Sequence, residues 1–342
     1  MPEIDVRPLD PSDAQRCAEL LAARHERDFA RLGHLEPALR EASGWRPLIE
    51  PLLANPRADG VAAVRGPELV GFLIGERMLL PPNDFASQFI PPRSIQIGLE
   101  GHAVAAGEDS LAVYRAMYAV LARPWVDAGF FTHRAAIVAG DSEAQEAWLT
   151  LGFGRYMSAA TRDTATPVPV TRQRTLNIER ASPEDLEDVL ALAEELDSWH
   201  WQSPMFWPVI HDAEQAVREF NLSALRSADV PAFVAYAEGR PVGMQTFLRP
   251  GFTPPIVKRD SDVYLFEGVV SDADRGGGVG QALLAHSMEW AVRSGYESCT
   301  LHFASGNPSG APFWLGHGFA PVEHTMERVI DSRVAWARPK PV

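Results

Sequence analysis

In the last third of the chain, the spacing of apolar and polar residues changes from one segment to the next. The segment 263–270 is short and mostly apolar, which is typical of a buried strand. Leu283, Leu284, Met288 and Ala291 then recur at helical spacing, which predicts a helix over 279–293 that ends before Gly295. A second apolar strand, 297–303, follows at once. The pattern therefore predicts a strand, a glycine-rich loop, a helix and a strand.

This pattern occurs twice. The segments 141-DSEAQEAWLTLGF-153 and 307-NPSGAPFWLGHGF-319 each place Trp seven residues after Asp or Asn and end in Gly-Phe. Upstream, Glu100-Gly101 matches Glu267-Gly268, the segment 62–74 matches 234–246, and Pro11-Ser12-Asp13 matches Pro183-Glu184-Asp185. The pairings keep one order and are 166 to 172 residues apart, which indicates a duplication.

We therefore predict two homologous domains, 1–158 and 176–342. The segment between them, 159–175, has little apolar periodicity and two prolines, which is typical of a linker. Each domain is expected to run as a strand, one or two helices, two or three antiparallel strands, a longer helix, a strand, a short helix and a strand. The predicted fold class is α/β, of the α+β kind.

Composition narrows the class of protein. The chain has 342 residues, 46% of them apolar and 22% charged, which is typical of a globular protein. No run of 18 apolar residues and no secretory signal is seen, so we expect a cytoplasmic protein without a membrane span. Cys17 and Cys299 are far apart and belong to no Cys/His cluster, so neither a metal site nor a disulfide is expected. The net charge of −14 disfavours nucleic acid and anionic membranes as partners, and suits a cationic amine.

The stretch 272-DADRGGGVGQALLAHSMEWAVRSG-295 carries the most specific chemistry. Its glycines precede a helix, where unpaired backbone N–H groups and the helix dipole favour an anion and missing side chains allow a phosphate to approach. Neither GxxxxGK[ST] nor GxGxxG is present. The alternative interpretation is a flexible surface turn.

The spacing Arg275-x-x-Gly278-x-Gly280, followed one strand later by 307–319, resembles the GCN5-related N-acetyltransferase (GNAT) superfamily. The resemblance implies a mixed, mostly antiparallel sheet flanked by helices and splayed between two central strands, and acyl-coenzyme A, most often acetyl-CoA, bound in that splay. It implies two tandem GNAT-like domains. The implied cofactor-binding residues are Val269, Val270, Arg275, Gly276, Gly277, Gly278, Val279, Gly280, Gln281, Asn307 and Trp314.

The first copy of the loop differs. Aligned on Glu100-Gly101, it reads 105-AAGEDSLAV-113, so that Glu108, Leu111 and Val113 stand in place of Arg275, Gly278 and Gly280. A carboxylate and bulky side chains would repel and obstruct a pyrophosphate. We expect one cofactor site per chain, in the second domain.

Acyl transfer to an amine needs a base, an oxyanion donor and an acid. By the resemblance, Glu267 is the candidate base and the backbone N–H near Val269 the oxyanion donor; a structural role shared with Glu100 is the alternative. Trp314 stands where relatives place an acidic tyrosine, and indole cannot donate a useful proton. Tyr264 is the preferred substitute, with Ser305, His302 and His317 as further candidates.

The aromatic-rich stretch 197-DSWHWQSPMFWP-208 is the candidate acceptor site, because aromatic walls can hold a cationic amine. The residues proposed to bind the acceptor are Asp197, Trp199, His200, Trp201 and Phe206. The alternative is a packing seam against the first domain.

The leading hypothesis is an acyl-CoA dependent N-acyltransferase that acts directly on the primary amine of a small molecule. Two alternatives stay open: a non-catalytic acyl-CoA sensor or scaffold, and an enzyme that acylates a protein amine or a hydroxyl group. The chain is expected to be a monomeric pseudo-dimer or a homodimer.

Overall fold

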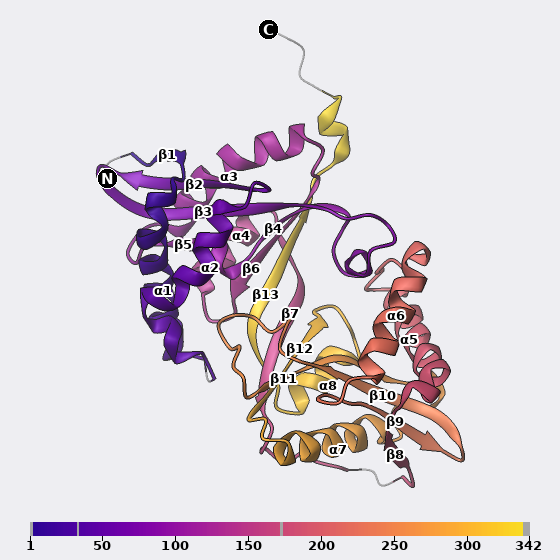
Figure 1. Cartoon of the computed structure of the whole chain (residues 1–342). Helices are drawn as coiled ribbons and strands as arrows, with labels where there is room; N and C mark the ends of the chain where they lie inside the picture. The colour runs from indigo at the N-terminus through magenta and orange to yellow at the C-terminus, as the bar shows by residue number, and fades with distance from the viewer. Residues whose placement is uncertain (1–2, 33, 172–173, 338–342) are drawn as a thin grey trace.

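A computed structural model describes residues 3–32, 34–171 and 174–337 (Figure 1). Within them, thirteen strands form one continuous sheet. In the first half the elements are β1 (Asp5–Pro8), α1 (Ala14–Phe29), α2 (Ala42–Ala54), β2 (Ala58–Arg65), β3 (Glu68–Leu79), β4 (Arg93–Ile97), β5 (His102–Val104), α3 (Ser110–Asp127), β6 (Thr132–Val138), α4 (Ser142–Thr150) and β7 (Gly154–Asp163). In the second half they are β8 (Asn177–Arg180), α5 (Leu186–Trp201), α6 (Glu214–Leu225), β9 (Ala232–Ala237), β10 (Arg240–Leu248), β11 (Asp262–Val270), α7 (Val279–Arg293), β12 (Ser298–Ala304), α8 (Gly310–Gly316) and β13 (Ala320–Val329).

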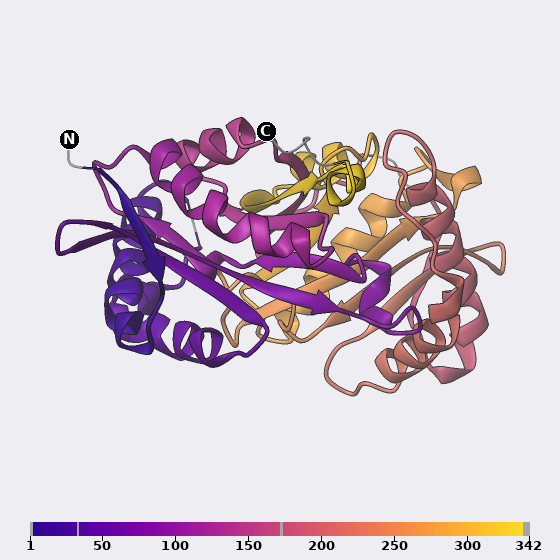
Figure 2. The same ribbon diagram turned by 90° about the horizontal axis from the view of Figure 1, so that it is seen from above.

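The two halves repeat one order of elements and lie side by side, with α1 and α2 at one end and α5 and α6 at the other (Figure 2). Among the described strands, only β4 with β6 and β11 with β12 are parallel pairs, and the other pairs are antiparallel. The predicted mixed, mostly antiparallel sheet is therefore confirmed. The helix predicted over 279–293 is α7, whose apolar face is buried and which is followed by Gly295 in a left-handed conformation.

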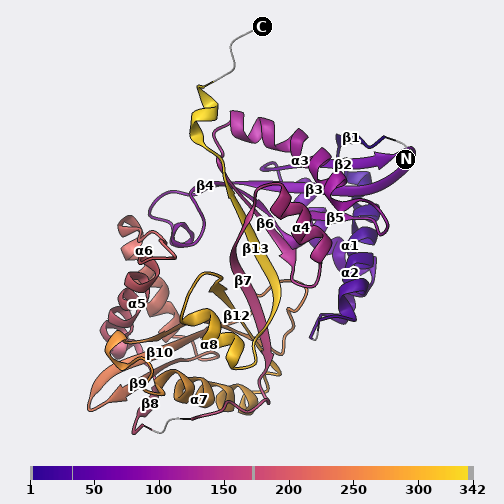
Figure 3. The ribbon, with the colours of Figure 1, turned by 180° about the vertical axis from the view of Figure 1, so that it is seen from behind.

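The final strand of each half pairs with the other half. β7 pairs with β12, and β13 pairs with β6, with the same register in both places: Ser298 lies opposite Asp163 as Thr132 lies opposite Val329. β7 and β13 also pair with each other in the middle of the sheet, where they run side by side in Figures 1 and 3. The two halves have therefore exchanged their last strands about a pseudo-two-fold axis.

This exchange corrects the expected linker. Residues 159–163 were predicted to belong to the linker 159–175, but they are the paired end of β7. Their side chains show no apolar alternation because β7 is covered on both faces here, where Ala159, Ala160, Thr161 and Arg162 are all buried. Near the axis, Ser158 Oγ and His324 Nδ1 are 2.8 Å apart.

Each half is splayed at its parallel pair. β11 and β12 pair only over Asp262–Leu265 and Ser298–Leu301, and then separate. β4 and β6 pair over Ser94–Ile97 and Thr132–Ala135 in the same way. Because separated strands leave backbone groups without a ladder partner, each splay is a place where a ligand or a side chain must complete the hydrogen bonding.

Candidate active site

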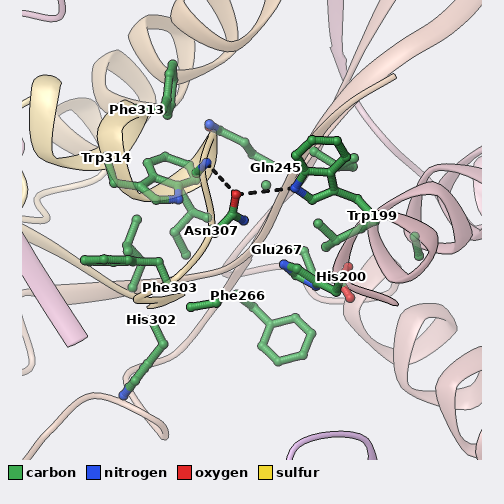
Figure 4. Close-up of a pocket in the computed structure, with 18 of the residues that line it drawn as sticks. Trp199, His200, Gln245, Phe266, Glu267, His302, Phe303, Asn307, Phe313 and Trp314 are labelled. Atoms are coloured by element: carbon green, nitrogen blue, oxygen red, sulfur yellow. Dashed lines mark hydrogen bonds between the residues drawn. The ribbon is translucent and has the colours of Figure 1, made fainter. Parts of the chain in front are cut away.

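A cavity of about 770 Å³ lies in the splay of the second half. Its wall includes the end of β11, the start of α7, parts of α5 and the loop before α8. Figure 4 shows Trp199, Glu267, Asn307 and Trp314 around this cavity. The predicted glycine loop, candidate base and acceptor stretch therefore meet in one place.

The glycine loop lines one end of the cavity. Gly276 and Gly278 have φ of 73° and 90°, and Gly278 is the N-cap of α7. Side chains rarely adopt this left-handed conformation, so glycine is required at both positions. A Cβ at Gly280 would lie 3.3 Å from the ring of Phe313. The helix N-terminus with its open backbone therefore fits an anionic pyrophosphate. Gly277 lies outside the cavity wall, whereas Val279 and Gln281 line it.

Arg275 closes the side of the loop that faces α5. Its guanidinium lies 3.9 Å from the ring centroid of Trp199, donates from Nε to the carbonyl of Val270 at 3.2 Å, and pairs with Asp272 at 2.9 Å. A cation stacked on an indole at this point contributes positive charge beside the helix N-terminus.

The backbone of β11 alternates in direction, and this corrects one expectation. Ser271 N donates to Val242 O on β10, and Val269 lies opposite Met244, so the polar groups of Val269 face β10. The carbonyl of Val270 faces the splay, because it accepts from Arg275. By alternation the backbone of Gly268 faces the splay too. Gly268 and Val270, in place of Val269, present backbone groups to the cavity.

Glu267 lies next to a bulge in β11. Thr246 is opposite Glu267, and Phe247 is opposite Leu265, so Phe266 is the extra residue and the strand bends there. Within the described residues, Glu267 Oε2 is buried and has no hydrogen-bond partner. Burial raises the pKa of this carboxyl to about 8, with a further contribution from the negative charge of Asp197. Burial also raises the pKa of Asp197 to about 6.

Three of the predicted acceptor residues, Asp197, Trp199 and His200, line the cavity. Trp199 Nε1 donates to Asn307 Oδ1 at 3.3 Å (Figure 4). The ring of His200 packs on Trp207 at 4.8 Å, and burial lowers its pKa to about 4, so it is neutral near pH 7.

Trp201 and Phe206 do not line the cavity, which corrects the prediction for both. Their side chains are 62% and 70% exposed. α5 ends at Trp201, and Phe206 has a left-handed φ of 52°, so the chain turns and presents both rings to solvent. Trp207, one residue further on, lines the cavity instead.

Asn307 acts as a cap at the start of α8. Its Oδ1 accepts hydrogen bonds from the backbone N–H groups of Ser309 and Gly310 at 3.0 and 2.9 Å. The same oxygen accepts from Trp199, so this residue joins the acceptor side to the cofactor side of the cavity.

Trp314 is buried, and its ring packs closely against Gly268. A Cβ built on Gly268 would lie 3.0 Å from the ring.

Of the four candidate acids, Tyr264 and His302 line the cavity, with Tyr264 Oη 2.8 Å from His302 Nδ1. Burial raises the pKa of Tyr264 and lowers that of His302 to about 4. Ser305 and His317 lie outside the cavity wall.

The corresponding splay of the first half is filled by side chains. Arg24, from α1, donates to the carbonyls of Leu99 and His102 at 2.9 and 2.6 Å. His102 Nε2 donates across the splay to the carbonyl of Ala136 at 2.8 Å. Arg24 and His102 thus take up backbone carbonyls on both sides of this splay. In the loop, Glu108 pairs with Arg65 at 2.8 Å.

Several residues of the cavity wall were not predicted, and they come from outside the second domain. Phe85, Gln88, Phe89 and Arg134 belong to the first half, and Thr171 to the linker. Thr171 donates to Gln281 Oε1, at 3.2 Å from its backbone N–H and 3.0 Å from its hydroxyl. The two aromatic residues in 85-FASQF-89 are evident in the sequence, but nothing in the sequence indicates that they contact the second half.

Residues 186–319 match the sequence profile of the acetyltransferase (GNAT) family. Residues 186–319, in the second half of the chain, are therefore similar to a GNAT-family domain. This similarity supports an acyl-CoA dependent N-acyltransferase activity, with acetyl-CoA or coenzyme A as the co-substrate of the family. No curated protein sequence matches the chain.

Solved structures extend the likeness of fold to both halves. A GCN5-related N-acetyltransferase from Sphaerobacter thermophilus is 16% identical, with a TM-score of 0.56 and coverage of 96% of this chain and 98% of that one. A tandem GNAT protein from the clavulanic acid biosynthesis pathway is 16% identical, with a TM-score of 0.51 and coverage of 99% and 100%. At these identities the likeness concerns the fold, which is that of two tandem GNAT domains.

The described residues contain neither a candidate membrane span nor a candidate metal site. No helix among them is long and apolar enough to cross a membrane. In the same part of the chain, no group of three or more His, Cys, Asp or Glu side chains is placed to hold a metal ion.

Proposed function

We propose that the GNAT domain transfers an acyl group, most often acetyl, from acyl-coenzyme A to the primary amine of a small molecule. The observation that carries the proposal is the position of Glu267, whose buried Oε2 has no hydrogen-bond partner among the described residues, in the same cavity as the glycine loop of α7. An unpartnered buried carboxylate is costly to retain, and active sites are where such groups occur.

The residues of the cavity can supply each step that the reaction needs. Bound acyl-coenzyme A would supply the thioester whose acyl carbon is attacked. Glu267 Oε2 accepts a proton from the amine nitrogen as the new C–N bond forms. The backbone N–H groups of Gly268 and Val270 face the splay and can stabilise negative charge on a carbonyl oxygen there.

Tyr264 is the candidate source in the cavity wall for the proton that the departing sulfur requires. Tyr264 retains its phenolic proton because burial raises its pKa, and its hydroxyl contacts His302. Trp314 cannot take this role, since its indole N–H is not acidic. Solvent is the other source.

A small acceptor is favoured over a protein side chain by the form of the cavity. Residues of both halves cover it, and the carboxylates of Asp197 and Glu267 are buried inside it. Asp197, with a pKa of about 6, is ionised near pH 7, and its negative charge favours a cationic ligand that can enter completely.

The test is release of free coenzyme A from acetyl-CoA, measured with a thiol reagent over a panel of small amines, alcohols and lysine peptides. We expect release that depends on an amine, and the acetylated amine as product by mass spectrometry. Binding of acetyl-CoA without release for any acceptor would support the sensor or scaffold alternative. Transfer only to lysine peptides or alcohols would support the alternative of an enzyme that acylates a protein amine or a hydroxyl group.

A further inference from the structure

The connection between β3 and β4, residues 80–92, crosses from the first half to the acceptor side of the second. Figures 1 and 3 show it beside α6. Phe85 stacks on Phe220 of α6 with ring centroids 4.1 Å apart and an angle of 15° between the planes. Gln88 Nε2 donates to the carbonyl of Ile210 at 3.1 Å. The first half therefore forms part of the wall of a site whose cofactor loop belongs to the second.

Five phenylalanines from four segments meet at this wall. Phe266, the bulged residue of β11, is at their centre, with ring centroids 4.9 Å from Phe220, 5.8 Å from Phe89, 6.0 Å from Phe252 and 6.1 Å from Phe85. Phe89 and Phe252 remain 42% and 53% exposed. The cluster thus presents aromatic faces that a ligand with an apolar, planar body would cover.

The partners of the Arg134 side chain lie in the first half and on β13. Its Nε donates to Glu327 at 2.7 Å, its Nη1 donates to the carbonyl of Phe89 at 2.6 Å, and its guanidinium lies 4.3 Å from the ring centroid of Tyr156. Arg134 therefore holds the 80–92 connection in place and offers no free cation to the acceptor side. Among the described residues of the cavity wall, Asp197 has no oppositely charged partner, and its negative charge near pH 7 favours a cationic amine at the inner end.

The corresponding connection of the second half, residues 249–261, behaves differently. It reaches the first half, where Ile256 and Val257 are 1% and 2% exposed within the core that contains Leu35 and Trp45. Glu36 N donates to the carbonyl of Ile256. The connection 249–261 therefore fills the space where it meets the first half, whereas the connection 80–92 leaves the cavity of the second half open.

We propose that residues 80–92 of the first half are the specificity-determining wall of the GNAT domain, and that they select a primary amine joined to an aromatic ring by a short alkyl chain. This inference rests on the proposed function of the same site. The first half, which has lost its own cofactor splay to Arg24 and His102, is retained because it completes the acceptor site of the second.

The experiment compares 2-phenylethylamine with 1,4-diaminobutane as acceptors for the wild type and the double variant Phe85→Leu/Phe89→Leu. Leucine keeps apolar volume but removes the stacked faces, each worth a factor of about 2 to 10 in binding. We expect the wild type to prefer 2-phenylethylamine, and the double variant to lose at least about fivefold more kcat/KM for it than for the diamine, mainly through KM. Leu79→Ala is the control, because Leu79 ends β3 directly before this connection, is 57% exposed and does not line the cavity.

Equal losses for the two amines, or no loss, would overturn the inference. If the double variant fails to fold, Phe89→Leu alone gives the same comparison at a half-exposed ring. The proposed function fails separately, when the wild type releases no coenzyme A with any acceptor. In that case the affinity for 2-phenylethylamine, followed by the fluorescence of Trp199 and Trp207, still tests the wall: weaker binding by the variant supports it and unchanged binding contradicts it.

Discussion

Glu267 and Glu100 occupy equivalent positions in the two halves and have different surroundings. Glu267 faces an open cavity with an oxygen that has no partner, and its neighbouring charge is the carboxylate of Asp197. Burial raises the pKa of Glu100 as well, but the nearby cation of Arg24 opposes this shift. The same residue type is therefore available for proton transfer in one half only.

The pH dependence of transfer follows from the raised pKa of Glu267. Because this pKa is about 8, the carboxyl keeps its proton below that pH and cannot accept one, so kcat/KM should rise with pH through about 8. Glu267→Gln should lower kcat/KM by about 10² to 10⁴ and abolish this rise. Glu100→Gln is the matched control and should keep the wild-type profile. An unchanged profile in Glu267→Gln would remove Glu267 as the base.

At single residues, the sequence was informative where function depends on local backbone. Gly276 and Gly278 require positive φ, which glycine alone adopts freely, so the unusual backbone of this loop was visible in the sequence. Trp201 and Phe206 were assigned wrongly, because their directions depend on where α5 ends. The residues from the first half were missed, since their contacts are set by the packing of the two halves.

Elements rather than single side chains decide which backbone groups meet the cavity. The bulge at Phe266 and the alternation of β11 turn Gly268 and Val270 toward the splay. Periodicity predicted α7 and its neighbouring strands, because their apolar faces are clear. The end of β7 was predicted as linker, because a strand buried between β12 and β13 with small and polar residues carries no such signal.

The start of α8 provides a test at the scale of an element. Asn307→Ala removes the acceptor for two backbone N–H groups and for Trp199, and should lower the free energy of unfolding by about 1 kcal/mol. Asn307→Asp retains an acceptor oxygen and should stay close to the wild type. Chemical denaturation measures both variants. Equal stability of Asn307→Ala and the wild type would contradict the capping role.

At the scale of the whole molecule, the exchange of β7 and β13 makes each half incomplete without the other. β12 and β6 both obtain their outer neighbour from the opposite half. The same exchange brings residues 80–92 to the acceptor side of the GNAT domain and residues 249–261 to the first half. The duplication was visible in the sequence, but the exchange was not, since register between distant strands leaves no local pattern.

Separating the halves tests this dependence. We expect the fragments 1–171 and 174–342, expressed apart, to give no monomer that binds acetyl-CoA, and to recover binding when folded together as a 1:1 complex. The full chain cut by a protease within 172–173 is the control for the break itself, and should remain associated. A folded, monomeric 174–342 fragment with the affinity of the full chain would show that β7 is not needed.

The central claim is that one chain has one acyl-CoA site, at the glycine loop of α7. Calorimetric titration of acetyl-CoA into the wild type, Gly278→Glu and Gly107→Glu tests it most directly. Gly107 is the matched control, because it has a φ of 84° in the first-half loop against 90° for Gly278. We predict one acetyl-CoA per chain for the wild type and Gly107→Glu, and none for Gly278→Glu. Two per chain, none in the wild type, or undiminished binding by Gly278→Glu would contradict the claim.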